Sequence, residues 1–253
     1  MEVFSYNEND KIKFSLNEGD FCTILGEGNK RIINNLYYLN KNDFVKLNYM
    51  SFKNFDKTKI GTRINFVLND TVDLFICTKV KDEINFLLEN KGLSPLKITE
   101  LISEYTFKFK LRDVLEDDPS TIGSTKQILL KFVIAFLCEP KVLVLDNIFE
   151  NLDLLEKEFI IEELKEYVKK GNVVINFTSN IEEAIIGNKL ILTSKTQLLA
   201  EGKTLSVLNE EKLLKRLGLG EPFIIELCKR LMDYNLIDKY YYDYKKLVDN
   251  IWK

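Results

Sequence analysis

The chain has 253 residues, of which 45 % are hydrophobic and 30 % charged, a composition typical of a globular protein with a buried core. Its formal net charge of −3 excludes a general attraction to nucleic acid or anionic lipid. The absence of histidine excludes histidine catalysis and histidine metal sites, and the four cysteines form no CxxC pair. An acidic N-terminus and the lack of a long apolar run predict a soluble cytoplasmic chain with reduced thiols.

Short apolar runs alternate with segments of helical spacing along the chain. In chain order we predict strands at 3–6, 11–16 and 21–25, a helix at 30–39, a strand at 64–68, helices at 82–90 and from Pro95, an apolar helix at 126–138, a strand at 142–145, a helix at 154–169, a strand at 173–178, a short helix at 181–186, and a hairpin of 190–193 with 197–200. After Gly202 the pattern becomes helical. This alternation favours a largely parallel sheet covered by helices.

Four segments in order resemble one known family. They are the strand, glycine turn and helix at 21–36, and the segments 60–94, 123–153 and 201–231. Together they resemble an ABC-type ATP-binding cassette, and most of all the ATPase subunits of energy-coupling-factor transporters. The resemblance implies an α/β, ABC-type P-loop ATPase fold with a mixed β-sheet core, a helical subdomain and a small helical C-terminal extension.

The same resemblance implies a domain organisation. We expect the nucleotide-binding domain at 1–202, its helical subdomain at about 75–135, and a C-terminal helical extension at 203–253.

The turn GEGNKRI corresponds to the P-loop, whose backbone N–H groups and lysine hold the nucleotide phosphates. The nucleotide-binding positions that the resemblance implies here are Gly26, Gly28, Asn29, Lys30, Arg31 and Ile32. Lys30 takes the place of the P-loop lysine, but it follows Gly26 by four positions, whereas the motif needs six. Arg31 takes the place of the magnesium-binding hydroxyl, and arginine cannot ligate Mg²⁺. Two interpretations stay open: a plain glycine turn, or weak, metal-independent anion binding.

The positions that correspond to the catalytic groups are mostly replaced. Asp146, at the end of the VLVL strand, corresponds to the residue that bridges to Mg²⁺, and we expect it to keep a site role. Asn147 stands in the place of the general base and cannot accept a proton from water. Ser179 corresponds to the histidine that senses the γ-phosphate, and Leu68 to the Q-loop glutamine.

The signature motif and the D-loop have counterparts as well. The signature-like residues are Gly123, Ser124, Thr125 and Lys126, and the D-loop aspartate is Asp153. The polar members could still bind an anion at a helix N-terminus, although helix N-capping by Ser124 is the simpler interpretation. Tyr6 is interpreted as a strand tyrosine rather than an aromatic that stacks on adenine.

Three functions are compatible with this pattern. The first is a degenerate cassette subunit with weak or no ATP hydrolysis, whose binding of ATP and Mg²⁺ is weakened or lost. By resemblance it would pair with a second cassette, contact a membrane T-component through the region Leu68–Asn90, and lie at the inner face of the cell membrane. The alternatives are an unusual but active Mg²⁺-dependent ATPase and a soluble regulatory protein outside transport. The sequence gives no transported substrate.

Overall fold

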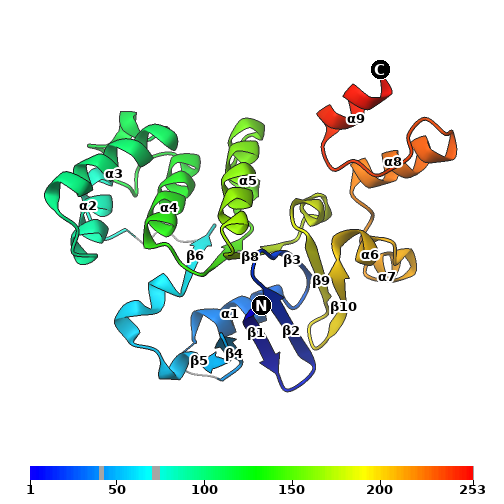
Figure 1. Ribbon diagram of the computed structural model, residues 1–253, viewed down its shortest axis with the longest axis horizontal. Coiled ribbons are helices and arrows are strands. Elements are labelled where there is room, and N and C mark those ends of the chain that lie inside the picture. Colours follow the sequence, from blue (N-terminus) through cyan, green and yellow to red (C-terminus); the bar gives the residue numbers. More distant parts are fainter. Residues whose placement is uncertain (40–42, 70–74, 253) are drawn as a thin grey trace. The chain divides into compact units, whose positions relative to one another are not determined.

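The computed structural model describes residues 1–39, 43–69 and 75–252 (Figure 1). The chain folds into two compact units, one of Met1–Lys53 with Val168–Lys253 and the other of Asn54–Tyr167. Across the described ranges, no helix is both long enough and apolar enough to cross a membrane.

The first unit contains two groups of strands. An antiparallel sheet has the order β2-β1-β4-β5, and a mixed group has the order β10-β9-β3-β8. In the mixed group β3 pairs in parallel with both β8 and β9, and β10 pairs with β9 antiparallel. These strands are β1 (Glu2–Glu8), β2 (Ile12–Asn17), β3 (Phe21–Gly26), β4 (Val45–Leu47), β5 (Met50–Ser51), β8 (Val173–Thr178), β9 (Lys189–Thr193) and β10 (Leu198–Lys203). The strand β8 is buried along its whole length, as a central parallel strand requires.

The helices of the first unit follow strands β3, β8 and β10 along the chain. They are α1 (Asn29–Tyr37), the 3-10 segment η5 (Ile181–Ile186), α6 (Thr204–Leu208), α7 (Glu211–Arg216), α8 (Phe223–Asp233) and α9 (Tyr244–Ile251), with η1 (Phe52–Asn54) where the chain leaves the unit. Apolar residues of the C-terminal helices share one core with Leu25 of β3 and with Leu190 and Leu192 of β9. The predicted boundary between 202 and 203 therefore lies within one continuous core, and it stays a prediction.

The second unit is mainly helical. Its elements are η2 (Lys57–Thr62), β6 (Ile64–Leu68), α2 (Val80–Asn90), α3 (Pro95–Lys108), η3 (Arg112–Val114), α4 (Ser124–Cys138), β7 (Val142–Asp146), η4 (Ile148–Asn151) and α5 (Leu154–Lys169). The strands β6 and β7 pair in parallel, and α2 contacts both α3 and α4 (Figure 1). From Thr125 to Cys138 no residue of α4 is exposed, which confirms the prediction of a helix buried on all sides.

The predicted strands and helices are confirmed with shifts of one to three residues at their ends. Strands β4 and β5 were not predicted, because three and two residues are too few to show an alternating pattern. The α/β fold class is confirmed.

Candidate functional site

The glycine turn between β3 and α1 is short and tightly packed. The strand ends at Gly26, and the helix begins at Asn29. Gly26 has a φ of 132°, and a Cβ there would lie 1.9 Å from the carbonyl oxygen of Thr193. A Cβ at Gly28 would lie 2.7 Å from the carbonyl oxygen of Ser194. Both glycines are therefore required by the approach of the β9–β10 connection to this turn.

Asn29 anchors the first turn of α1 to the sheet. Its amide nitrogen donates to the carbonyl oxygens of Ile24 and Thr178, each at 3.0 Å, at the ends of β3 and β8. The Oδ1 atom of Asn29 is buried and has no hydrogen-bond partner within the described residues. A phosphate oxygen would not supply one, since it is itself an acceptor.

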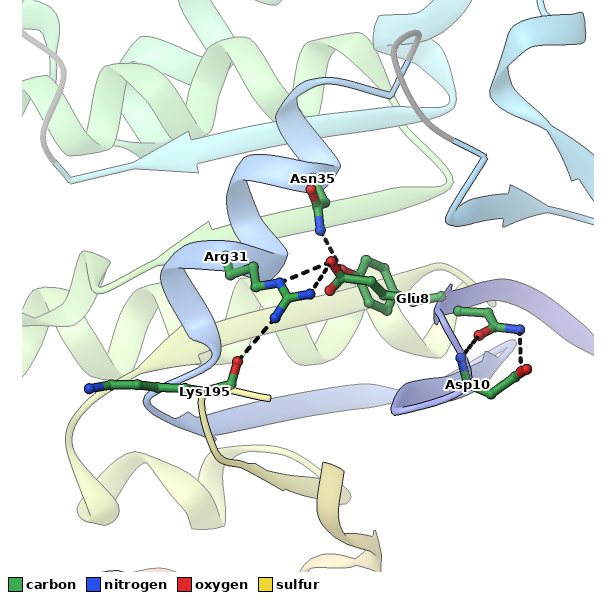
Figure 2. A network of polar contacts seen from close by, with 7 residues as sticks. Glu8, Asp10, Arg31, Asn35 and Lys195 are labelled. Atoms are coloured by element: carbon green, nitrogen blue, oxygen red, sulfur yellow. Dashed lines mark hydrogen bonds and ion pairs between the residues drawn. The ribbon is translucent and has the colours of Figure 1, made fainter. Parts of the chain in front are cut away.

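The next two residues of α1 have different surroundings. Lys30 is exposed. Arg31 donates from Nε and Nη2 to Oε1 of Glu8, at 2.9 and 2.6 Å, and from Nη1 to the carbonyl oxygen of Lys195 at 3.3 Å (Figure 2). Ile32 is fully buried and packs into the core. The position predicted to replace the magnesium ligand is thus held by an acidic side chain of the same chain.

Glu8 belongs to a wider polar network on β1. The Tyr6 hydroxyl donates to Oε2 of Glu8 at 3.0 Å, and the Asn35 amide donates to the Tyr6 hydroxyl at 2.8 Å. The Tyr6 ring is buried and stacks on Phe14, which supports the interpretation of a core tyrosine over an adenine-stacking one. Burial, together with the negative charge of Glu8, raises the pKa of the Tyr6 hydroxyl.

Ser179 directly follows the buried strand β8 and is exposed. The next residue, Asn180, caps η5 by accepting a hydrogen bond from the backbone N–H of Glu182 at 3.0 Å. The end of β8 is therefore built as a strand-to-helix turn. A serine hydroxyl at this position lacks the ring nitrogen through which a histidine could exchange a proton.

In the second unit the end of β7 carries Asp146 and Asn147. Asn147 adopts a left-handed conformation, with a φ of 46°, and its Nδ2 donates to Oδ1 of Asp146 at 2.9 Å. Leu68 of β6 lies opposite Asp146 in the strand register. The carbonyl oxygen of Leu68 accepts from Nζ of the buried Lys131 at 2.9 Å. The predicted Q-loop position is thus fixed through its backbone, while its side chain has no polar atom.

The signature-like residues use their polar groups within the second unit. Gly123 is the N-cap of α4 and Ser124 is its first residue, without a side-chain capping bond, so the prediction that Ser124 caps the helix is wrong. Thr125 donates to the carbonyl oxygen of Asn151 at 2.9 Å. Lys126 donates to the carbonyl oxygen of Lys110 and to Oδ1 of Asp113, the latter at 2.7 Å.

Asp153, the predicted D-loop aspartate, directly precedes helix α5. Its Oδ1 accepts from the backbone N–H of Glu156 at 2.8 Å, and the Glu156 carboxylate accepts from the N–H of Asp153 at 3.2 Å. This reciprocal pair is a capping box. Capping thus explains Asp153 without a bound nucleotide.

The residues at these positions do not fit a triphosphate bound with Mg²⁺ as a P-loop binds it. The end of β9 lies against Gly26 and the β9–β10 connection lies against Gly28, and Arg31 is occupied by Glu8. Mg²⁺ requires several oxygen ligands, and in the second unit Asp146 is followed by an amide.

The sequence analysis missed two features of the candidate site, namely Glu8 as the partner of Arg31 and the close contact of Thr193 with Gly26. Glu8 lies two residues after Tyr6, on the buried face of β1, and that alternation is the only signal for it. The approach of Thr193 to Gly26 joins residues far apart in the chain.

Comparison with solved structures identifies the fold. One protein from Clostridium perfringens, cbiO1 of the cbiONQ ABC transporter complex, matches with a TM-score of 0.65 and 19 % identity over 90 % of this chain and 98 % of that chain. A dimeric ATP-binding cassette in a post-hydrolysis state, bound to ADP and Pi, matches with a TM-score of 0.65 and 18 % identity over 80 % of this chain and 96 % of that chain. The chain therefore has the fold of an ATP-binding cassette.

Sequence comparison then leads to a narrower group. The energy-coupling factor transporter ATP-binding protein EcfA1 of Mycoplasmopsis pulmonis is 26 % identical over 236 residues, which are 90 % of this chain and 88 % of that protein. The EcfA1 protein of Mycoplasma genitalium is 27 % identical over 265 aligned residues, which cover 99 % of this chain and 93 % of that protein. No protein-family model matches the chain. These relatives confirm the resemblance to energy-coupling-factor ATP-binding subunits.

Proposed function

We propose that the chain is the ATP-binding-cassette subunit of an energy-coupling-factor-type transporter and that it works as a degenerate subunit with little or no ATP hydrolysis. The observation that carries this proposal is the glycine turn between β3 and α1. It is only three residues long, Gly26–Gly28, and it is packed against the chain's own β9–β10 connection. A turn of this length cannot surround a triphosphate with backbone N–H groups as a full P-loop does.

The residue types at the catalytic positions support the same proposal. Asn147 offers an amide where a base is needed, and loss of a positioned base costs about 10²–10⁴ in rate. Arg31 offers a cation where a magnesium ligand is needed. ATP and Mg²⁺ are the ligands of the cassettes that this chain resembles, and here their binding is weakened or lost.

The subunit would act through its partners. As in the dimeric cassette it resembles, a second cassette would pair with it, and a membrane T-component would contact the region Leu68–Asn90. Residues 70–74 of this region lie outside the described residues. Exposed apolar side chains at Ile76 and Phe86 support a role for the remainder in partner binding. Such contacts would place the chain at the inner face of the cell membrane.

Turnover measurements on the purified full chain, alone and with its partner cassette, test the catalytic part of the proposal. We expect no Mg²⁺-dependent ATP hydrolysis by the chain alone, and no change on Asp146→Asn. The matched control is Asp118→Asn, which also removes one carboxylate but lies on an exposed turn. Hydrolysis that requires Mg²⁺ and falls in Asp146→Asn but not in the control would establish the active ATPase instead.

Co-purification tests the transport part. The tagged chain, expressed in cells that make a T-component, is extracted from membranes in mild detergent. Recovery of a stoichiometric membrane partner is the expected result. A chain found only in the soluble fraction, with no cassette or membrane partner, would favour the soluble regulatory protein.

A further inference from the structure

The ion pair between Glu8 and Arg31 joins the first turn of α1 to the end of β1 (Figure 2). The Glu8 side chain is 6 % exposed and that of Arg31 is 46 % exposed. Each carboxylate oxygen of Glu8 accepts from a neighbour, Oε1 from Arg31 and Oε2 from the Tyr6 hydroxyl. The pair therefore has the hydrogen-bonded geometry that a buried charge requires.

The position of Arg31 in the helix makes this pair informative. Arg31 is the third residue of α1, so its charge lies near the positive end of the helix dipole, where a cation is disfavoured. A guanidinium at a helix N-terminus would suit a phosphate, because both the side chain and the free N–H groups can donate to it. In this chain the anion beside the guanidinium is Glu8.

A phosphate would have to compete with that carboxylate. Moving Arg31 onto a ligand would leave the Glu8 carboxylate buried without its counter-ion, which is strongly unfavourable. With Arg31 in place, an approaching phosphate meets a guanidinium that is already paired with Glu8 and whose third nitrogen, Nη1, donates to the Lys195 carbonyl oxygen. Transfer of Arg31 from Glu8 to a phosphate would therefore break a largely buried ion pair in order to form a more exposed one.

We infer that Glu8 acts as an internal anion that occupies Arg31, and that it adds to the short, packed turn in keeping phosphate groups off the start of α1. This inference rests on the proposed function, since it explains why a cassette with a basic first turn would bind nucleotide weakly. It assigns to Glu8 a specificity role that lies outside the cassette motifs.

Binding of inorganic triphosphate without metal, measured by titration calorimetry on the full chain, tests the inference. Glu8→Gln keeps the size of the side chain and an oxygen acceptor, but it removes the charge. Glu27→Gln is the matched control, because it removes an exposed carboxylate in the same turn. We expect Glu8→Gln to bind triphosphate about tenfold more tightly than the wild type and the control, the value of roughly one charge-assisted hydrogen bond. Adding Arg31→Ala should abolish the gain.

Several results would overturn the inference. Equal gains in Glu8→Gln and Glu27→Gln would show a general charge effect. If Glu8→Gln still bound triphosphate more tightly when combined with Arg31→Ala, a group other than Arg31 would be responsible for the tighter binding. A double-mutant cycle on stability gives a test that does not depend on ligand binding. Urea unfolding is measured for the wild type, Glu8→Gln, Arg31→Ala and the double variant. Additive losses of stability would show that Glu8 and Arg31 do not interact and would contradict the ion pair. ATP turnover by the wild type would refute the degenerate subunit, whereas failure of Glu8→Gln to gain affinity would refute only the inference.

Discussion

Replacement of Gly26 by alanine tests whether the glycine turn is specified by packing within the chain. The φ of 132° lies in a region that residues with a Cβ rarely adopt, and such strain costs about 1–3 kcal/mol. The added Cβ would also lie 1.9 Å from the Thr193 carbonyl oxygen, so the backbone of β9 or of the turn must move. Forced shifts of this kind cost about 1–3 kcal/mol. We therefore expect Gly26→Ala to lower the free energy of unfolding by about 2–6 kcal/mol.

Urea unfolding followed by circular dichroism measures this loss, and two other glycines separate its causes. Gly92 has a φ of 74° but no atom within 4 Å of an added Cβ, so Gly92→Ala should show backbone strain alone, about 1–2 kcal/mol. Gly61 has an ordinary φ and open space, so Gly61→Ala should be neutral or slightly stabilising. A Gly26→Ala variant no less stable than Gly92→Ala would refute the steric argument.

Two further predictions concern the second unit. Asp153→Ala removes the N-cap of α5 and should lower the free energy of unfolding by about 1 kcal/mol in the same urea assay, and a neutral result would contradict the capping box. The hydrogen bond from Lys126 holds the pKa of Asp113 below its usual range. The pair therefore stabilises the folded chain at a pH above the pKa that Asp113 has in the unfolded chain. This stabilisation is lost as the pH falls through the lower pKa that Asp113 has in the folded chain. Lys126→Met should raise the pKa of Asp113 in an NMR titration and reduce the loss of stability between about pH 5 and pH 3, and an unchanged pKa would refute the pairing.

Most of the fold could be predicted because burial and periodicity are local properties. The strand Val173–Thr178 is apolar except for Asn176 and Thr178, and it is buried along its length. The apolar helix Ser124–Cys138 was equally clear from its composition. Strands β4 and β5 could not be predicted, because three and two residues show no alternating pattern and because β4 pairs with β1, which is distant in sequence.

The candidate site was less predictable, because side-chain partners depend on tertiary structure. The sequence placed Arg31 beside Lys30 at a helix start, which is compatible with phosphate binding. It did not show that Glu8, more than twenty residues earlier, would bind the guanidinium. Likewise, Ser124 was expected to cap a helix predicted from residue 126, but the helix begins two residues earlier, at Ser124, and Gly123 takes the N-cap position.

The backbone at Asn147 limits which side chains fit at this position. Asparagine tolerates the left-handed conformation better than most residues, and its amide donates to Asp146. A glutamate at this position would adopt the same φ at a cost and would place a second carboxylate beside Asp146 where a donor now stands. Asn147→Glu would therefore lower the stability of the turn that follows β7. The geometry of this turn thus favours asparagine independently of any bound nucleotide.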